Sequence, residues 1–165
     1  MTAFSLLPGI SAQAVQTTRL QMNVLTAGEP HGEPVVLLHG NVSSARFWEE
    51  TMQALASQGA YAIAPDLRGY GDTQARPIDA RRGLRDWSDD LHSLVEALGM
   101  GPFHLVGWSA GGGIAMQYAI DYAAQVRSLT LVAAMSPFGF GGTHGVNGEP
   151  NYADFAGSGG GTANP

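Results

Sequence analysis

The sequence contains no cysteine, and only 13% of its 165 residues are charged. Without cysteine the chain has no disulfide framework, no thiolate zinc site and no cysteine nucleophile. Fourteen acidic residues outnumber eight basic ones, and the formal net charge of −6 offers no basic surface for nucleic acid or an anionic membrane. We therefore expect neither of these partners.

Long hydrophobic runs are also missing. No apolar stretch approaches the ~18 residues that a membrane-spanning helix needs. The first ten residues lack the basic start of a secretion signal and are interrupted by Pro8. The 44% of apolar residues is nevertheless enough for a hydrophobic core. The composition therefore predicts one globular core in a cytoplasmic protein that does not span a membrane.

What the sequence does contain is a regular alternation of strand-like and helix-like segments. An alternating stretch at residues 15–26 predicts one or two antiparallel strands. Short apolar runs, typical of strands buried on both faces, follow at 35–38, 61–64, 103–106 and 129–134. The alternation predicts the α/β class, with a mostly parallel, doubly wound sheet whose ligands bind outside the carboxyl ends of the strands.

The helices between these strands are indicated by their ends and by one apolar face. Ser43 or Ser44 can cap a helix that runs to about residue 57, and Gly59 suits a left-handed position after it. A second helix with an apolar face at 87–98 ends at Gly99, and a third covers about 111–124. Three acids lie where the N-terminal dipole of the second helix favours negative charge: Asp86, Asp89 and Asp90.

Residues 107–111 read Gly-Trp-Ser-Ala-Gly and place Ser109 between an apolar strand and a helix. This is the context of a nucleophile elbow, a sharp strand-to-helix turn that exposes a serine hydroxyl. Gly107 and Gly111 are small enough to let the strand and the helix pack closely. The helix N-terminus also presents free N–H groups to developing negative charge. We interpret Ser109 as a nucleophile; the alternative is a helix-capping serine in a glycine-rich turn.

Two loops upstream of the Ser109 turn carry further sequence motifs. His39-Gly40-Asn41 follows one predicted strand, and residues 66–73, Asp-Leu-Arg-Gly-Tyr-Gly-Asp-Thr, follow the next. With the Ser109 turn, and in this order, the chain resembles the α/β-hydrolase superfamily over about residues 18–140. The resemblance implies the N-terminal part of such a core at 1–138, incomplete on its C-terminal side. The glycine-rich segment 139–165 would be the start of a lid or a tail.

The resemblance also implies roles around Ser109. The backbone N–H groups of Asn41 and Ala110 would form the oxyanion hole, where one lost donor typically costs about 3–4 kcal/mol. His39 and Gly40 would shape the oxyanion loop, and His39 would not be the base. In residues 66–73, Asp66 and Arg68 would organise the loop, with Arg68 free for ion pairing. Two aromatic residues are candidates for the pocket wall: Trp108, which could instead be a packing residue, and Phe138.

The triad acid and histidine of such enzymes do not occur at the expected strand ends. No carboxylate follows the run at 129–134, and His144 lies in the glycine-rich segment. His92 is expected on a helix flank and His104 within a buried strand, so neither is a candidate base. Loss of a triad histidine lowers the rate by about 10⁶. We therefore expect the 165 residues to be almost inactive as an enzyme on their own. We also expect strand 129–134 to form an open edge of the sheet. The C-terminal remainder would be a separate chain, cleaved off or not included.

The resulting hypothesis is a serine hydrolase that cleaves a small ester or lactone through an acyl-enzyme on Ser109, with no metal and no cofactor. A serine nucleophile disfavours the alkyl-enzyme chemistry of epoxide hydrolases and haloalkane dehalogenases. Hydrolysis of C–C bonds, aminopeptidase action and cofactor-free perhydrolysis remain alternatives for the same site. A non-catalytic scaffold of the same fold is the alternative from another class.

Overall fold

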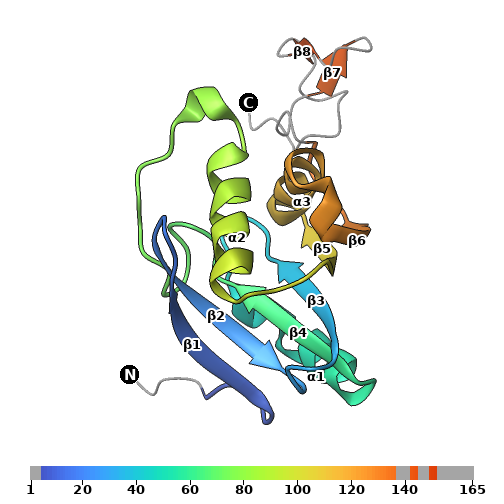
Figure 1. The fold of residues 1–165 in the computed structure, drawn as a ribbon. Coiled ribbons are helices and arrows are strands. Elements are labelled where there is room, and N and C mark those ends of the chain that lie inside the picture. Colours follow the sequence, from blue (N-terminus) through green and yellow to red (C-terminus); the bar gives the residue numbers. More distant parts are fainter. Residues whose placement is uncertain (1–4, 137–141, 145–148, 152–165) are drawn as a thin grey trace.

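The central element is a six-stranded sheet in the order β1-β2-β4-β3-β5-β6 (Figure 1). The computed structural model describes residues 5–136, 142–144 and 149–151. Strands β4, β3, β5 and β6 run parallel, whereas β2 is antiparallel to both β1 and β4. The strands are β1 (Ile10–Gln16), β2 (Gln21–Ala27), β3 (Glu33–Leu38), β4 (Ala60–Pro65), β5 (Phe103–Trp108) and β6 (Val126–Val132). The predicted mostly parallel α/β sheet is confirmed.

Helices cover both faces of this sheet. Helix α1 (Glu49–Ser57) packs on one face, while α2 (Arg85–Ala97) and α3 (Ala110–Asp121) pack on the other. Strand β3 shows why its sequence is continuously apolar: Val36 and Leu38 belong to the core under α2 and α3, and Leu37 belongs to the core under α1. A strand that is covered on both sides cannot place polar side chains on either one.

The start of α1 differs from the prediction. Ser44 has an extended backbone and its side chain makes no capping hydrogen bond, and the first turn is a 3₁₀ turn, η1 (Ala45–Trp48). The carboxylate of Asp66, from the loop after β4, accepts the Ala45 N–H instead, at 2.7 Å. The predicted serine cap is therefore wrong, because an acceptor from a distant segment replaces it. Gly59 does adopt the predicted left-handed conformation after α1, and Gly99, which was predicted to end the next helix, also has a positive φ after α2.

The C-terminal side of the described sheet ends at β6. This strand begins three residues before the predicted run at 129–134, and α3 ends at Asp121 before a 3₁₀ turn, η3 (Ala123–Gln125). Within the described residues β6 is the edge strand of the sheet, and its residues Leu129, Leu131 and Val132 are 37–43% exposed. Beyond β6, β7 (Gly142–His144) pairs antiparallel with β8 (Glu149–Asn151).

The remaining predictions for the fold concern the C-terminal segment and membrane spans. Phe138 and most of the glycine-rich segment 139–165 lie outside the described residues, so the predicted boundary at 138 stays a prediction. In the part of the chain that the structure describes, no helix is both long and apolar enough to cross a membrane.

Candidate active site

Ser109 occupies a strained turn at the carboxyl end of β5. Its backbone has φ 53° and ψ −118°, which is uncommon for any residue other than glycine. The turn is fixed by main-chain hydrogen bonds. The Ser109 N–H donates to the carbonyl of Val132 at 3.0 Å, and the Ser109 carbonyl accepts from the N–H groups of Gly112, Gly113 and Met135 at 3.0–3.3 Å. The serine side chain takes no part in holding its own backbone.

The glycines around Ser109 are required by close packing. A Cβ atom on Gly107 would lie 2.5 Å from the carbonyl oxygen of Gly111, and one on Gly111 would overlap the carbonyl oxygens of Leu38 and His39. A Cβ atom on Gly40 would lie 2.9 Å from the Trp108 ring and 3.0 Å from the Ser109 Cβ. The loop after β3 therefore lies directly against the Ser109 turn.

His39 is fully buried and both of its ring nitrogens are occupied. Nε2 accepts the N–H of Leu67 at 3.0 Å, which requires the neutral ring, and the Nδ1–H donates to the carbonyl of Gly40 at 2.8 Å. Burial lowers the pKa of His39, against the opposing effects of the Gly40 hydrogen bond and of Asp66. A neutral imidazole that is committed to two backbone groups can shape the loop but has no free nitrogen with which to deprotonate Ser109.

A cavity of about 210 Å³ is lined in part by Ala110, the residue after Ser109, and by Gly40, whose added Cβ would lie 3.0 Å from the Ser109 Cβ; Ser109 itself does not line it. The backbone N–H groups of Asn41 and Ala110, both on its wall, make no hydrogen bond to any described residue. Two such donors at the mouth of a cavity can stabilise an oxyanion. No charged residue contributes to the wall in the described part of the chain. The lining residues are Gly40, Asn41, Leu67, Tyr70, Leu84, Trp87, Ala110, Ile114 and Met135.

The aromatic pocket candidates are placed differently from one another. Trp108 is not among the residues that line this cavity, and its ring stacks on Phe47 with centroids 4.0 Å apart and planes within 7°. Trp108 thus packs against the core under α1, and its role in a substrate pocket stays a prediction. Trp87 was not predicted to lie in the site, but it does contribute to the wall of this cavity. Phe138 cannot be placed.

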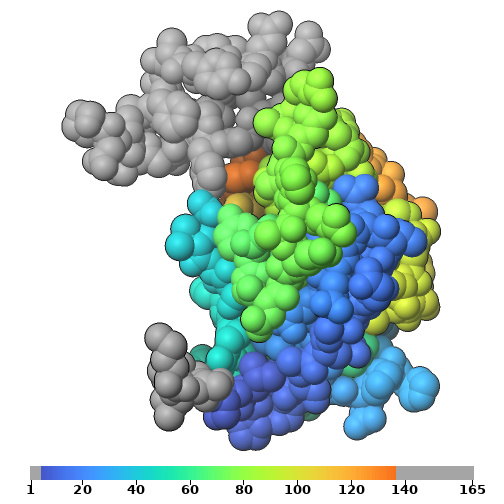
Figure 2. Space-filling view, turned by 90° about the vertical axis from the view of Figure 1, so that its left-hand side faces the viewer, coloured from blue at the N-terminus to red at the C-terminus, as the bar shows by residue number. Residues whose placement is uncertain are grey.

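The loop after β4 is hydrogen-bonded to the loop after β3. Figure 2 shows this segment, in green, lying across one face between the cyan chain after β3 and the blue β1–β2 hairpin. Asp66 accepts the N–H groups of Ala45 and Asp72 at 2.7 and 3.0 Å, and the hydroxyl of Tyr70 donates to Asn41 Oδ1 at 2.5 Å. The Tyr70–Asn41 contact was not predicted, since no local pattern links two residues 29 positions apart.

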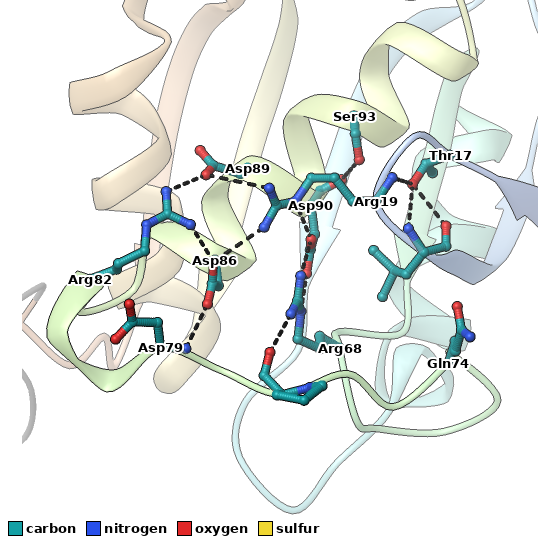
Figure 3. Close-up of polar contacts among 12 residues, drawn as sticks. Thr17, Arg19, Arg68, Gln74, Asp79, Arg82, Asp86, Asp89, Asp90 and Ser93 are labelled. Atoms are coloured by element: carbon teal, nitrogen blue, oxygen red, sulfur yellow. Dashed lines mark hydrogen bonds and ion pairs between the residues drawn. The ribbon is translucent and has the colours of Figure 1, made fainter.

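A charged network fixes the same loop to helix α2 (Figure 3). Arg68 forms a bidentate pair with Asp90, at 2.6 and 2.7 Å, and both side chains are almost fully buried. Arg19 of the β1–β2 turn also binds Asp90, at 2.7 Å, and Arg82 binds Asp86 and Asp89. The hydrogen bonds that Arg68 donates to Asp90 raise the pKa of Arg68. The predicted ion pairing of Arg68 is confirmed, and the acids of α2 prove to be partners of three arginines.

His92 and His104 lie away from Ser109, and the side chain of His144 is outside the part of the chain that the structure describes. The side chain of His104 is 37% exposed at the opposite end of β5, where it contacts Ser128 Oγ at 2.6 Å and Glu33 at 3.2 Å, so its predicted burial is wrong. His92 stacks on Tyr122, on the predicted helix flank. No residue in the described ranges forms a hydrogen bond with Ser109 Oγ, and none of those ranges holds a cluster of three metal-ligating side chains.

Comparison with known proteins agrees with this geometry. The family model described as "alpha/beta hydrolase fold" matches residues 33–157. The chain is 36% identical over 106 residues to a 2-hydroxy-6-oxo-2,4-heptadienoate hydrolase of Pseudomonas putida, covering 63% of this chain and 38% of that one. It is 32% identical over 120 residues to epoxide hydrolase 2 of Siraitia grosvenorii, covering 73% and 37%.

Solved structures show the same relation. A crystal structure of an epoxide hydrolase from Vigna radiata superposes with a TM-score of 0.70 at 28% identity, covering 77% of this chain and 41% of that one. The chain thus spans about two fifths of the length of the relatives it matches. With the family model matching more than half of its residues, the chain belongs to the α/β-hydrolase fold family.

Proposed function

We propose that the protein is a serine hydrolase that cleaves a small carboxylic ester or lactone through an acyl-enzyme on Ser109. One observation carries the proposal: a serine on a strained strand-to-helix turn is followed directly by Ala110, which lines a cavity together with Asn41, and the backbone N–H groups of both lining residues have no partner among the described residues. Relatives of this chain are hydrolases by name, which supports the same reaction class.

The proposed reaction begins with attack of Ser109 Oγ on the substrate carbonyl carbon. The electron pair of the C=O bond moves onto its oxygen, which accepts hydrogen bonds from the N–H groups of Asn41 and Ala110. Collapse of this intermediate expels the alcohol, which takes up the proton that Ser109 lost, and water then releases the acid from the acyl-enzyme.

The proposal requires a general base. His39 is committed to Leu67 and Gly40, so we infer that the histidine and the acid that orients it come from a part of the protein outside the described residues. The segment that carries this histidine and acid would be needed for activity, whether it belongs to the same chain or to a separate one.

The substrate class follows from the cavity wall. The described lining is mainly apolar and carries no charge, which favours an uncharged acyl group of modest size. Cleavage of a C–C bond is the second candidate, favoured by the 36% identity to the heptadienoate hydrolase. Epoxide opening by an alkyl-enzyme is disfavoured, because the nucleophile position holds Ser109 in place of a carboxylate.

A fluorophosphonate probe tests the proposal on the intact protein. The probe should modify Ser109, as located by mass spectrometry of the peptide, and p-nitrophenyl esters of short acyl chains should be hydrolysed. Ser109→Ala should lose both reactions, and Ser57→Ala, at an exposed serine of α1, should keep them. A wild-type protein that neither reacts with the probe nor cleaves esters would favour the non-catalytic scaffold. Cleavage of a vinylogous diketone without ester hydrolysis would favour the second candidate.

A further inference from the structure

The oxyanion loop contains a strained residue that packing does not hold. Val42, directly after Asn41, has φ 52°, an outlier for a β-branched side chain, and its side chain is 92% exposed. Such a conformation costs about 1–3 kcal/mol and persists only where neighbouring groups enforce it. Because Val42 buries almost nothing, the enforcement has to come from hydrogen bonds.

One side-chain oxygen supplies that enforcement. Oδ1 of Asn41 accepts the Val42 N–H at 3.0 Å and the hydroxyl of Tyr70 at 2.5 Å. The first bond closes the strained turn, and the second fixes the rotamer of the asparagine that makes it. Asn41 is itself exposed, so without Tyr70 its amide could rotate into solvent and release Val42.

The position of Tyr70 is fixed by a ring contact and by a backbone hydrogen bond. Its ring meets His39 edge to face, with centroids 5.3 Å apart and planes at 73°, and its N–H donates to the carbonyl of Leu67 at 2.9 Å. Leu67 in turn binds His39 through its own N–H. The phenol therefore projects from a turn that is fixed at two points, and it reaches the oxyanion loop from the cavity wall.

We propose that Tyr70 is a positioning residue for the oxyanion hole. Its hydroxyl orients the Asn41 side chain, which holds the turn at Val42 and so aims the backbone N–H of Asn41 at the developing oxyanion. This inference rests on the proposed serine-hydrolase function. Because the N–H group acts on charge that develops in the transition state, its misplacement lowers kcat more than it raises KM.

The test uses Tyr70→Phe in the intact protein, with esters as substrate and the fluorophosphonate probe to count active sites. Phenylalanine keeps the ring against His39 and in the cavity wall and removes only the hydroxyl. We expect kcat per titrated site to fall about 10- to 100-fold, with KM within about twofold and the pH profile unchanged. Tyr61→Phe is the matched control, since its hydroxyl bonds to no described residue and it lines a separate cavity.

A second variant keeps the test decisive if Tyr70→Phe folds poorly. Asn41→Ala retains the backbone N–H and removes Oδ1, so it should reproduce the loss in kcat, and the double variant should be no slower than the slower single one.

Three results would overturn the inference: an unchanged kcat per site in a folded Tyr70→Phe, a change in KM alone, or fully additive losses in the double variant. If the wild type itself is not labelled at Ser109, the proposed function fails first. If it is labelled and the variants match it, only the role of Tyr70 fails.

Discussion

Breaking the buried pair between Arg68 and Asp90 should destabilise the fold more than breaking any other ion pair described above. Asp90 accepts three charge-assisted hydrogen bonds, two from Arg68 and one from Arg19, at 2.6–2.7 Å. Replacement by asparagine keeps the shape but removes the charge and turns one acceptor into a donor that faces a guanidinium. Breaking a buried pair in this way costs about 3–5 kcal/mol, and since one oxygen remains we expect about 3 kcal/mol for Asp90→Asn.

Urea unfolding of the intact protein measures this loss. With a slope of about 2 kcal/mol per molar urea, the midpoint should fall by about 1.5 M. Arg81→Gln is the control, because its pair with Asp79 is exposed and its loss should leave the midpoint unchanged. The reasoning would be refuted if Asp90→Asn and Arg81→Gln shifted the midpoint equally, since burial would then not matter.

Two further predictions concern pH and packing. Burial opposes the ionisation of Asp86 and Asp89. Two hydrogen bonds favour it, from the Asp79 N–H to Asp86 and from the Tyr122 hydroxyl to Asp89, and nearby arginines favour it as well. Because these effects outweigh burial, the pKa of each carboxyl group lies below the usual 3.8. The free energy of unfolding should be constant from pH 7 to about pH 5 and should fall below about pH 4, as these carboxylates become protonated. A free energy of unfolding that does not change down to about pH 2.5 would contradict this. Gly107→Ala would place a Cβ atom 2.5 Å from the Gly111 carbonyl oxygen and should lower the free energy of unfolding, measured in urea, by about 1–3 kcal/mol. Gly101→Ala is the control, because a Cβ atom there would meet open space and should leave this free energy almost unchanged. Equal losses in the two variants would show that the contact at Gly107 relaxes freely.

Local sequence patterns were sufficient for the framework of the fold. The apolar run at 35–38 predicted a strand covered on both faces because both faces of β3 are buried. Gly59 and Gly99 marked the ends of α1 and α2 because each needs a positive φ. The Ser109 turn was recognisable for the same reason, since its neighbours had to be small. Wherever one residue and its near neighbours decide the conformation, the sequence was informative.

Contacts between distant segments were not predictable in this way. Asp66 caps η1 from 21 residues away, which is why the expected serine cap was wrong. Arg19 lies 71 residues from Asp90, and no periodicity reports which arginine an acid will meet. His104 was expected to be buried with its strand, but its side chain lies on the face of β5 that is only partly covered, beside Glu33 and Ser128. These errors arise where the packing of elements, rather than local conformation, determines the partner.

The way in which the Ser109 turn is held has a consequence for redesign. All of its hydrogen bonds run through the main chain, to Val132, Gly112, Gly113 and Met135, and none involves the serine hydroxyl. The support of this turn is thus separate from the side chain at position 109. Under the proposed function, a cysteine or an aspartate at position 109 would replace the nucleophile and leave the hydrogen bonds of the turn in place.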